Sequence, residues 1–175
     1  MRPILFLLFL LFSLTAGAQP TFPGSFTGHW QGEIIWHRPG TPEPRKFKMQ
    51  LLIAPVDTAN HYTWKIIYGD KGEDTRPYEL KPVDAQKGHW VVDEKNGILL
   101  DQYFIGGKLH SVFSVGGSTI VNSYWLEGEN LHVEFVSYPA KAVRTSGAGT
   151  EETPTVESYG VRSYQKGILT RVKPR

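Results

Sequence analysis

The sequence of 175 residues contains no cysteine and has a formal net charge of +2, with acidic and basic residues interspersed along it. Without cysteine no disulfide can form, so the fold must be stabilised by core packing and hydrogen bonds. The charge pattern also lacks the dense basic face of nucleic-acid-binding proteins, because the nearest basic run, Arg45-Lys46-Phe47-Lys48, is interrupted by an aromatic residue. We therefore expect no nucleic acid among the partners.

The amino-terminal segment has the plan of a cleavable secretory signal. Arg2 precedes an apolar run from Ile4 to Leu14, and Ala16-Gly17-Ala18 follows it. This run is shorter than the ~20 residues that a membrane-spanning helix needs, and no later run reaches that length. We predict a signal peptide at residues 1–18, and a single domain at residues 19–175 that is secreted or periplasmic and has no membrane span after cleavage. An uncleaved membrane anchor is the alternative.

The remainder of the chain is predicted to be nearly all β. Apolar residues alternate with a period of two after Gln19, and no segment of helix length has a clear period of 3.6. We expect strands near residues 26–37, 45–54, 61–69, 75–83, 88–93, 97–105, 108–115, 118–127, 130–138 and 155–170.

The turns between these segments predict how the strands are connected. Asn96-Gly97, Gly106-Gly107 and Gly116-Gly117 are typical of tight hairpins, so residues 88–138 should form a meander of five antiparallel strands. A meander leaves two open edges, which closure of the sheet removes. We therefore predict a closed, antiparallel up-and-down β-barrel of about 8–10 strands, with the irregular segments 38–44 and 139–154 as loops at its mouth.

Strand alternation indicates which side chains face the barrel interior. In the first strand the even positions, such as Trp30 and Ile34, are expected to point inward. Candidate ligand-binding residues on inward positions of later strands are Phe47, Tyr62, Trp64, Arg76 and Tyr78. Arg76 lies two positions before Tyr78, so alternation points its side chain inward as well. A buried, unpaired guanidinium is costly, so Arg76 is either a ligand contact or a residue at the rim where its strand begins.

The motif Gly28-His29-Trp30 resembles the first strand of the calycin superfamily, the lipocalin-like barrels. The number of strands is similar to the nitrobindin-like and fatty-acid-binding-protein-like branches. The resemblance implies that Trp30 closes the barrel floor and that a basic residue of the last strand covers it, for which Arg162 is the candidate. Gly28, Trp30 and Arg162 are therefore the predicted closure residues.

The resemblance does not imply that this protein binds the cofactor of those families. Nitrobindin-like proteins hold haem through a histidine near the carboxyl end, and no histidine follows His132 in this sequence. None of the six histidines forms an H-x-H pair, so we expect no metal site and no cofactor.

The sequence contains no recognisable catalytic signature. It has no cysteine nucleophile, no Gly-x-Ser-x-Gly elbow and no phosphate-binding glycine loop. The expected function is therefore that of an exported barrel binding a small, mainly apolar or amphiphilic ligand in its central cavity. A structural or protein-interaction module with a filled core is the alternative, and a small barrel enzyme the third possibility; the oligomeric state is left open.

Overall fold

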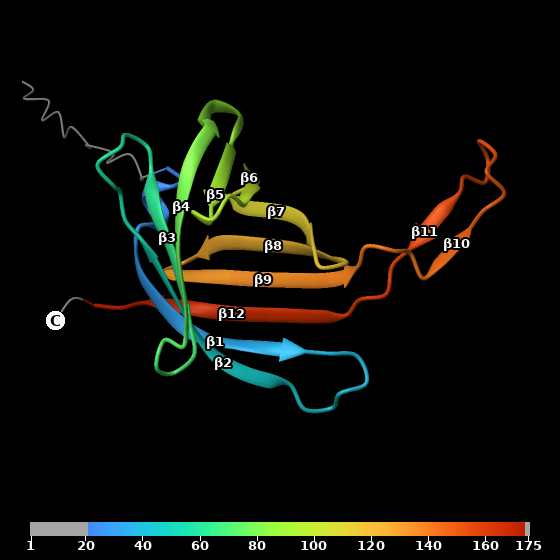
Figure 1. Cartoon of the computed structure of the whole chain (residues 1–175), viewed down its shortest axis with the longest axis horizontal. Coiled ribbons are helices and arrows are strands. Elements are labelled where there is room, and N and C mark those ends of the chain that lie inside the picture. Colours follow the sequence, from blue (N-terminus) through green and yellow to red (C-terminus); the bar gives the residue numbers. More distant parts are fainter. Residues whose placement is uncertain (1–20, 174–175) are drawn as a thin grey trace, which may run out of the picture.

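A computed structural model describes residues 21–173 of the chain as a closed antiparallel barrel of ten strands (Figure 1). Around the barrel the order is β1-β12-β9-β8-β7-β6-β5-β4-β3-β2. Barrel strands that are consecutive along the chain are therefore hydrogen-bonded neighbours, and the last strand, β12, pairs with the first, β1. This confirms the predicted up-and-down barrel and its meander from β5 to β9. The barrel strands are β1 (Gly28–His37), β2 (Arg45–Ile53), β3 (Tyr62–Tyr68), β4 (Asp74–Asp84), β5 (His89–Asp93), β6 (Leu99–Ile105), β7 (Lys108–Val115), β8 (Ser118–Glu127), β9 (Asn130–Pro139) and β12 (Ser163–Arg171).

A short hairpin interrupts the connection between the last two barrel strands. β10 (Arg144–Ser146) pairs with β11 (Val156–Ser158) in a separate two-stranded sheet, which projects away from the barrel (Figure 1). The predicted strand over 155–170 is therefore wrong in its extent, because residues 159–162 leave the sheet before β12 begins. Exposed apolar residues such as Val156 produced the strand pattern without a buried face to support it.

One end of the barrel is closed by aromatic side chains. The 3₁₀ turn η1 (Gly24–Phe26) carries Phe26 into the core, and the ring of Phe22 stacks on Phe104 with a centroid distance of 4.4 Å. Trp90 meets Phe22 edge to face at 5.3 Å. We call this aromatic-filled end the floor.

Trp30 is covered at the floor by Arg171, not by Arg162 as predicted. The Arg171 guanidinium carbon lies 4.1 Å from the Trp30 ring centroid, and the same side chain donates a hydrogen bond to the Thr27 carbonyl. The prediction for Arg162 is wrong because the register pairs Trp30 with Arg171, whereas Arg162 precedes β12 and donates to Ser118 Oγ at 2.6 Å. The basic cover comes from the end of the last strand.

The predicted closure glycine has a clear physical role beside this pair. Gly28 has φ of +147°, and a Cβ there would lie 2.2 Å from Arg171 Nη1. A side chain at this position would strain the backbone and displace the cation from Trp30.

The predicted signal peptide at residues 1–18 lies outside the described residues. Within residues 21–173, no helix has the length and apolar character needed to cross a membrane.

Candidate functional site

A cavity of about 490 Å³ opens at the end of the barrel opposite the floor. β1, β3, β5, β7 and β9 end there, so the connections at 38–44, 69–73, 94–98, 116–117 and 140–162 surround the opening. The predicted mouth loops belong to this group. We call the space the outer cavity; it is lined by Trp36, Phe47, Tyr68, Arg76, Phe113, Ser118, Ile120, Phe135, Ser137, Ser163 and Gln165.

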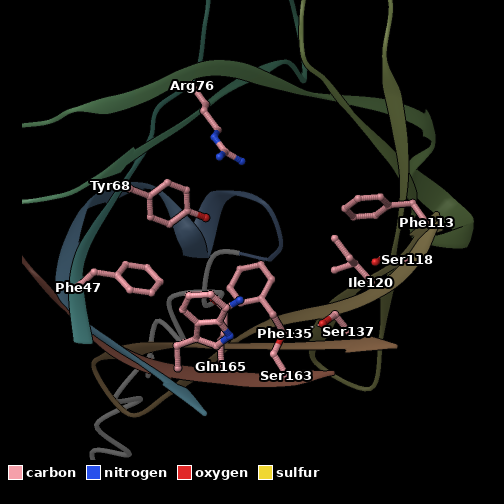
Figure 2. Close-up of a pocket in the computed structure, with 11 residues that line it drawn as sticks. Phe47, Tyr68, Arg76, Phe113, Ser118, Ile120, Phe135, Ser137, Ser163 and Gln165 are labelled. Atoms are coloured by element: carbon pink, nitrogen blue, oxygen red, sulfur yellow. Dashed lines mark hydrogen bonds between the residues drawn. The ribbon is translucent and has the colours of Figure 1, made fainter. Parts of the chain in front are cut away.

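Aromatic side chains account for five of the eleven residues in the wall of the outer cavity. Figure 2 shows Phe47 and Tyr68 on one side and Phe113 and Ile120 on the other, with their side chains projecting toward the space between them. Phe47 and Tyr68 meet edge to face at 5.8 Å. These residues come from inward positions of different strands, so the same alternation that fills the floor leaves an apolar lining here.

Five other residues of this wall are polar or charged: Arg76, Ser118, Ser137, Ser163 and Gln165. The hydroxyls of Ser137 and Ser163 are 2.7 Å apart and hydrogen-bonded to each other across the β9–β12 ladder. Because the two hydroxyls are hydrogen-bonded to each other, an apolar ligand group can lie beside them without leaving both unpaired.

Arg76 points into the outer cavity but is already paired with a carboxylate. Its Nη2 lies 2.6 Å from Asp74 Oδ2, its Nε donates to both Asp74 oxygens at 3.1 Å, and its guanidinium carbon is 5.1 Å from the Tyr68 ring centroid. The hydrogen bond from Arg76 lowers the pKa of Asp74, and the same bond raises the pKa of Arg76. Arg76 is the third residue of β4, so it is both near the rim and a cavity residue.

A second, smaller cavity of about 80 Å³ adjoins the first. Tyr68, Arg76, Phe113 and Phe135 line both spaces, which places the two side by side within the barrel. We call it the inner cavity; its other lining residues are Trp64, Ile66, Tyr78, Val92, Glu94, Leu100, Gln102, Asn122 and Tyr124. Trp64 and Tyr124 meet edge to face at 5.2 Å and form its most buried wall.

The structure brings four of the five predicted ligand-binding residues to these cavities. Phe47 lines the outer cavity, Trp64 and Tyr78 line the inner one, and Arg76 lines both. Tyr62 is in the lining of neither, within the described part of the chain. As the first residue of β3, Tyr62 lies near the floor and packs against the core there.

Sequence reasoning missed two buried amides in the inner cavity. Gln102 lies between Leu100 and Phe104 on the inward face of β6, and Asn122 lies between Ile120 and Tyr124 on that of β8. The signal was present in the sequence, since each polar residue shares the parity of apolar neighbours two positions away.

The histidines lie on other surfaces. His29 Nε2 is hydrogen-bonded to Gln50 at 2.7 Å, and His89 Nε2 contacts Asp101 Oδ1 at 2.7 Å. Over residues 21–173, no group of three or more histidine, aspartate or glutamate side chains is arranged to hold a metal ion.

Comparison with known proteins gives a likeness of fold. No protein-family model and no curated protein matches the sequence. A solved structure of a protein of unknown function from the DUF3598 family of Nostoc punctiforme is similar over 84% of this chain, with a TM-score of 0.60 and 14% identity. The matched region is 48% of that protein, so this chain spans about half of its length. The likeness and the ten-stranded closed barrel fit a lipocalin-like barrel fold.

Proposed function

We propose that this protein binds a small, mainly apolar ligand in the outer cavity. The observation that carries the proposal is an aromatic-lined space of about 490 Å³ at the mouth of the barrel, above a floor filled by side chains. Small-molecule pockets commonly have volumes of ~300–1,000 Å³ and a predominantly apolar wall with a few polar groups. The cavity has that size, and six of its eleven lining residues are apolar or aromatic.

Burial of apolar surface supplies most of the binding energy in this proposal. Each Å² of apolar surface removed from water contributes ~25 cal/mol, so affinity should increase with ligand size until the cavity is full. The pairing of Arg76 with Asp74 supports an uncharged body for the ligand, because the cation already has its counter-charge. A module with a wholly filled core would not present this space.

The proposal is tested with N-phenylnaphthylamine, a neutral dye whose emission rises in apolar surroundings. We expect the dye to brighten with the wild-type protein. Ile120→Glu should weaken binding at least ~tenfold, because it places a carboxylate in the apolar lining of the cavity. Val112→Glu is the matched control, since Val112 is 62% exposed on the outer face of the adjacent strand β7. Absence of brightening, or equal binding by the two variants, would overturn the proposal.

The same proposal includes kinship with the calycin superfamily. Its support is the combination of Gly28, Trp30 and a basic side chain from the last strand, Arg171, which is the arrangement that the resemblance implies. Kinship at this level concerns the architecture and the presence of a cavity, whereas the nature of the ligand depends on the lining residues.

We further propose that residues 1–18 direct export and that the mature protein is secreted or periplasmic. The support is the sequence of that segment, with Ala16 and Ala18 before the expected cleavage site. The intact mass of the exported protein should correspond to a chain beginning at Gln19. A full-length mass in the membrane fraction would overturn this part of the proposal.

A further inference from the structure

Two buried amide groups in the inner cavity have hydrogen-bonding capacity that the described residues do not use. Gln102 is 2% exposed and Asn122 is 7% exposed, and both line this cavity. Gln102 Oε1 and Asn122 Oδ1 are buried and have no hydrogen-bond partner among residues 21–173. Buried polar atoms are nearly always paired, so two unpartnered acceptors in one cavity require an explanation.

The neighbouring polar group does not fill this role. Ser111 faces Asn122 in the β7–β8 ladder, but its hydroxyl donates to the Asp101 carbonyl at 2.6 Å. The Gln102 amide nitrogen has a long bond of 3.3 Å to the Leu100 carbonyl, which uses its donor side and leaves the oxygen free. Both amide oxygens therefore lack a hydrogen-bond partner within the described part of the chain, in residues that belong to the wall of the inner cavity.

Size and charge restrict what that donor can be. A volume of about 80 Å³ corresponds to two or three water molecules at ~30 Å³ each, or to one small functional group. The charged residues in the lining are Arg76, which is paired with Asp74, and Glu94, whose carboxylate disfavours an anionic group. An ammonium would lose its hydration in so small a space, so the inner cavity favours an uncharged group over either ion.

We infer that the inner cavity receives an uncharged hydrogen-bond-donating group of the ligand: a hydroxyl, which donates to Gln102 Oε1 or Asn122 Oδ1, or a primary amide, whose two N–H groups donate to both. The inference rests on the proposed function, because the apolar body of the same ligand lies in the outer cavity. The ligand class is thus a neutral amphiphile, such as an alkyl alcohol or a primary alkyl amide, bound with its polar end inside the barrel. The four lining residues shared by the cavities place the polar group next to the apolar body of the ligand.

The test compares octanol with octyl methyl ether, which has a similar chain but no donor. Both displace N-phenylnaphthylamine, and the measured quantity is the ratio of the ether Kd to the alcohol Kd. We expect Gln102→Leu or Asn122→Leu, whichever removes the acceptor of the octanol hydroxyl, to lower this ratio about tenfold, while ether binding is retained. Gln31→Leu is the matched control, because Gln31 is exposed on the outward face of β1 and lines neither cavity; its ratio should equal that of the wild type.

A ratio that is the same in the wild type and both inner-cavity variants would overturn the inference and leave the proposed function standing. Failure of the dye, the alcohol and the ether to bind the wild type would overturn both. A second measurement needs no variant: in nitrogen-15-labelled wild-type protein, the side-chain amide signals of Gln102 and Asn122 should shift with octanol and not with the ether. Unshifted amides at saturating octanol, as expected if only water occupies the inner cavity, would also overturn the inference.

Discussion

Trp30 is held at the barrel floor by contacts on both its edge and its face. The indole N–H donates to the Phe26 carbonyl at 2.8 Å, while the Arg171 guanidinium lies over the ring. The buried donor is therefore paired, and the cation gains both the π face and the Thr27 carbonyl. The amino-terminal turn, the first strand and the last strand are joined through this one side chain.

Replacement of Arg171 should therefore destabilise the protein. We expect Arg171→Leu to lower the free energy of unfolding by about 1 kcal/mol, the upper end for a cation–π contact made by an exposed cation. Arg162→Leu should change it by less than ~0.5 kcal/mol, because Arg162 bonds Ser118 at the exposed mouth. Urea unfolding of the two variants measures the difference. Equal effects would show that the cover over Trp30 contributes nothing specific.

Tyr68 gives the barrel a pH dependence in the alkaline range. Burial raises the pKa of its phenol to about 12, compared with ~10 in an unfolded chain. Between these values the unfolded chain loses the proton while the folded protein keeps it, so stability is fully present below pH ~10 and falls as the pH rises toward 12. Tyr68→Phe should reduce this fall. The measurement is the free energy of unfolding by urea at about pH 9 and about pH 11 for both proteins; an identical decrease in the two would contradict the prediction.

At the scale of elements, the β10–β11 hairpin is separable from the barrel. All six of its strand residues are exposed, and in the described part of the chain its ladder is made between β10 and β11. The barrel ladder resumes on its far side, where Ser163 pairs with Ser137. The hairpin thus lies within a connection between neighbouring strands and adds little to the core.

Deletion of residues 141–160, with Ala140 joined to Val161 through Asn-Gly, should leave the barrel folded. We expect the free energy of unfolding to change by less than ~1 kcal/mol, since a shorter connection between paired strands costs no more entropy to close. Thermal unfolding and dye binding measure the outcome. Loss of a cooperative transition would mean that the hairpin contributes to the barrel fold.

Period-two patterning predicted the elements well where one face is buried. The meander from β5 to β9 and the inward positions of Trp30, Ile34 and Trp64 follow directly from alternation and turn residues. The same signal failed at 159–162, where Tyr159 and Val161 are exposed and no strand forms. The alternation of apolar residues indicates which side chains face the barrel interior, whereas the length of a strand depends on its pairing with a neighbouring strand.

The candidate site was predictable only in part for a related reason. Phe47 and Arg76 were identified by parity, but parity does not give the height of a residue along the barrel, which decides whether it lines a cavity or fills the floor. Tyr62 was misplaced in that way. Arg162 was chosen over Arg171 because the sequence of neither strand determines the register in which β12 pairs with β1. Placing these residues correctly requires the strand pairing of the folded barrel.

At the scale of the whole molecule, closure depends on one seam between the two ends of the chain. β1 pairs with β12 along eight positions, and glycines lie on both sides of it: Gly32 faces Leu169, and Gly167 faces Ile34. The last barrel strand must meet the first before the sheet has no edge, so this contact joins the residues most distant in sequence. The close approach at the seam leaves no room for added side chains there.

The seam should therefore control global stability, and Gly32→Ala tests this. A Cβ at Gly32 would lie 2.2 Å from the Ile168 backbone oxygen and 2.9 Å from Leu169 Cδ2, and the backbone atom can move only if β1 and β12 separate. We expect a loss of about 3 kcal/mol in the free energy of unfolding, at the upper end for overpacking. Gly160→Ala is the control, because its Cβ would meet only the flexible Val143 Cγ1 at 3.3 Å outside the barrel and should change stability by less than ~0.5 kcal/mol. Tryptophan fluorescence and far-ultraviolet circular dichroism should report the same shifted urea midpoint, since a seam that closes the barrel couples all its strands. If Gly32→Ala unfolds at the wild-type midpoint, or shifts the fluorescence transition alone, closure at β1–β12 is not what makes the barrel cooperative.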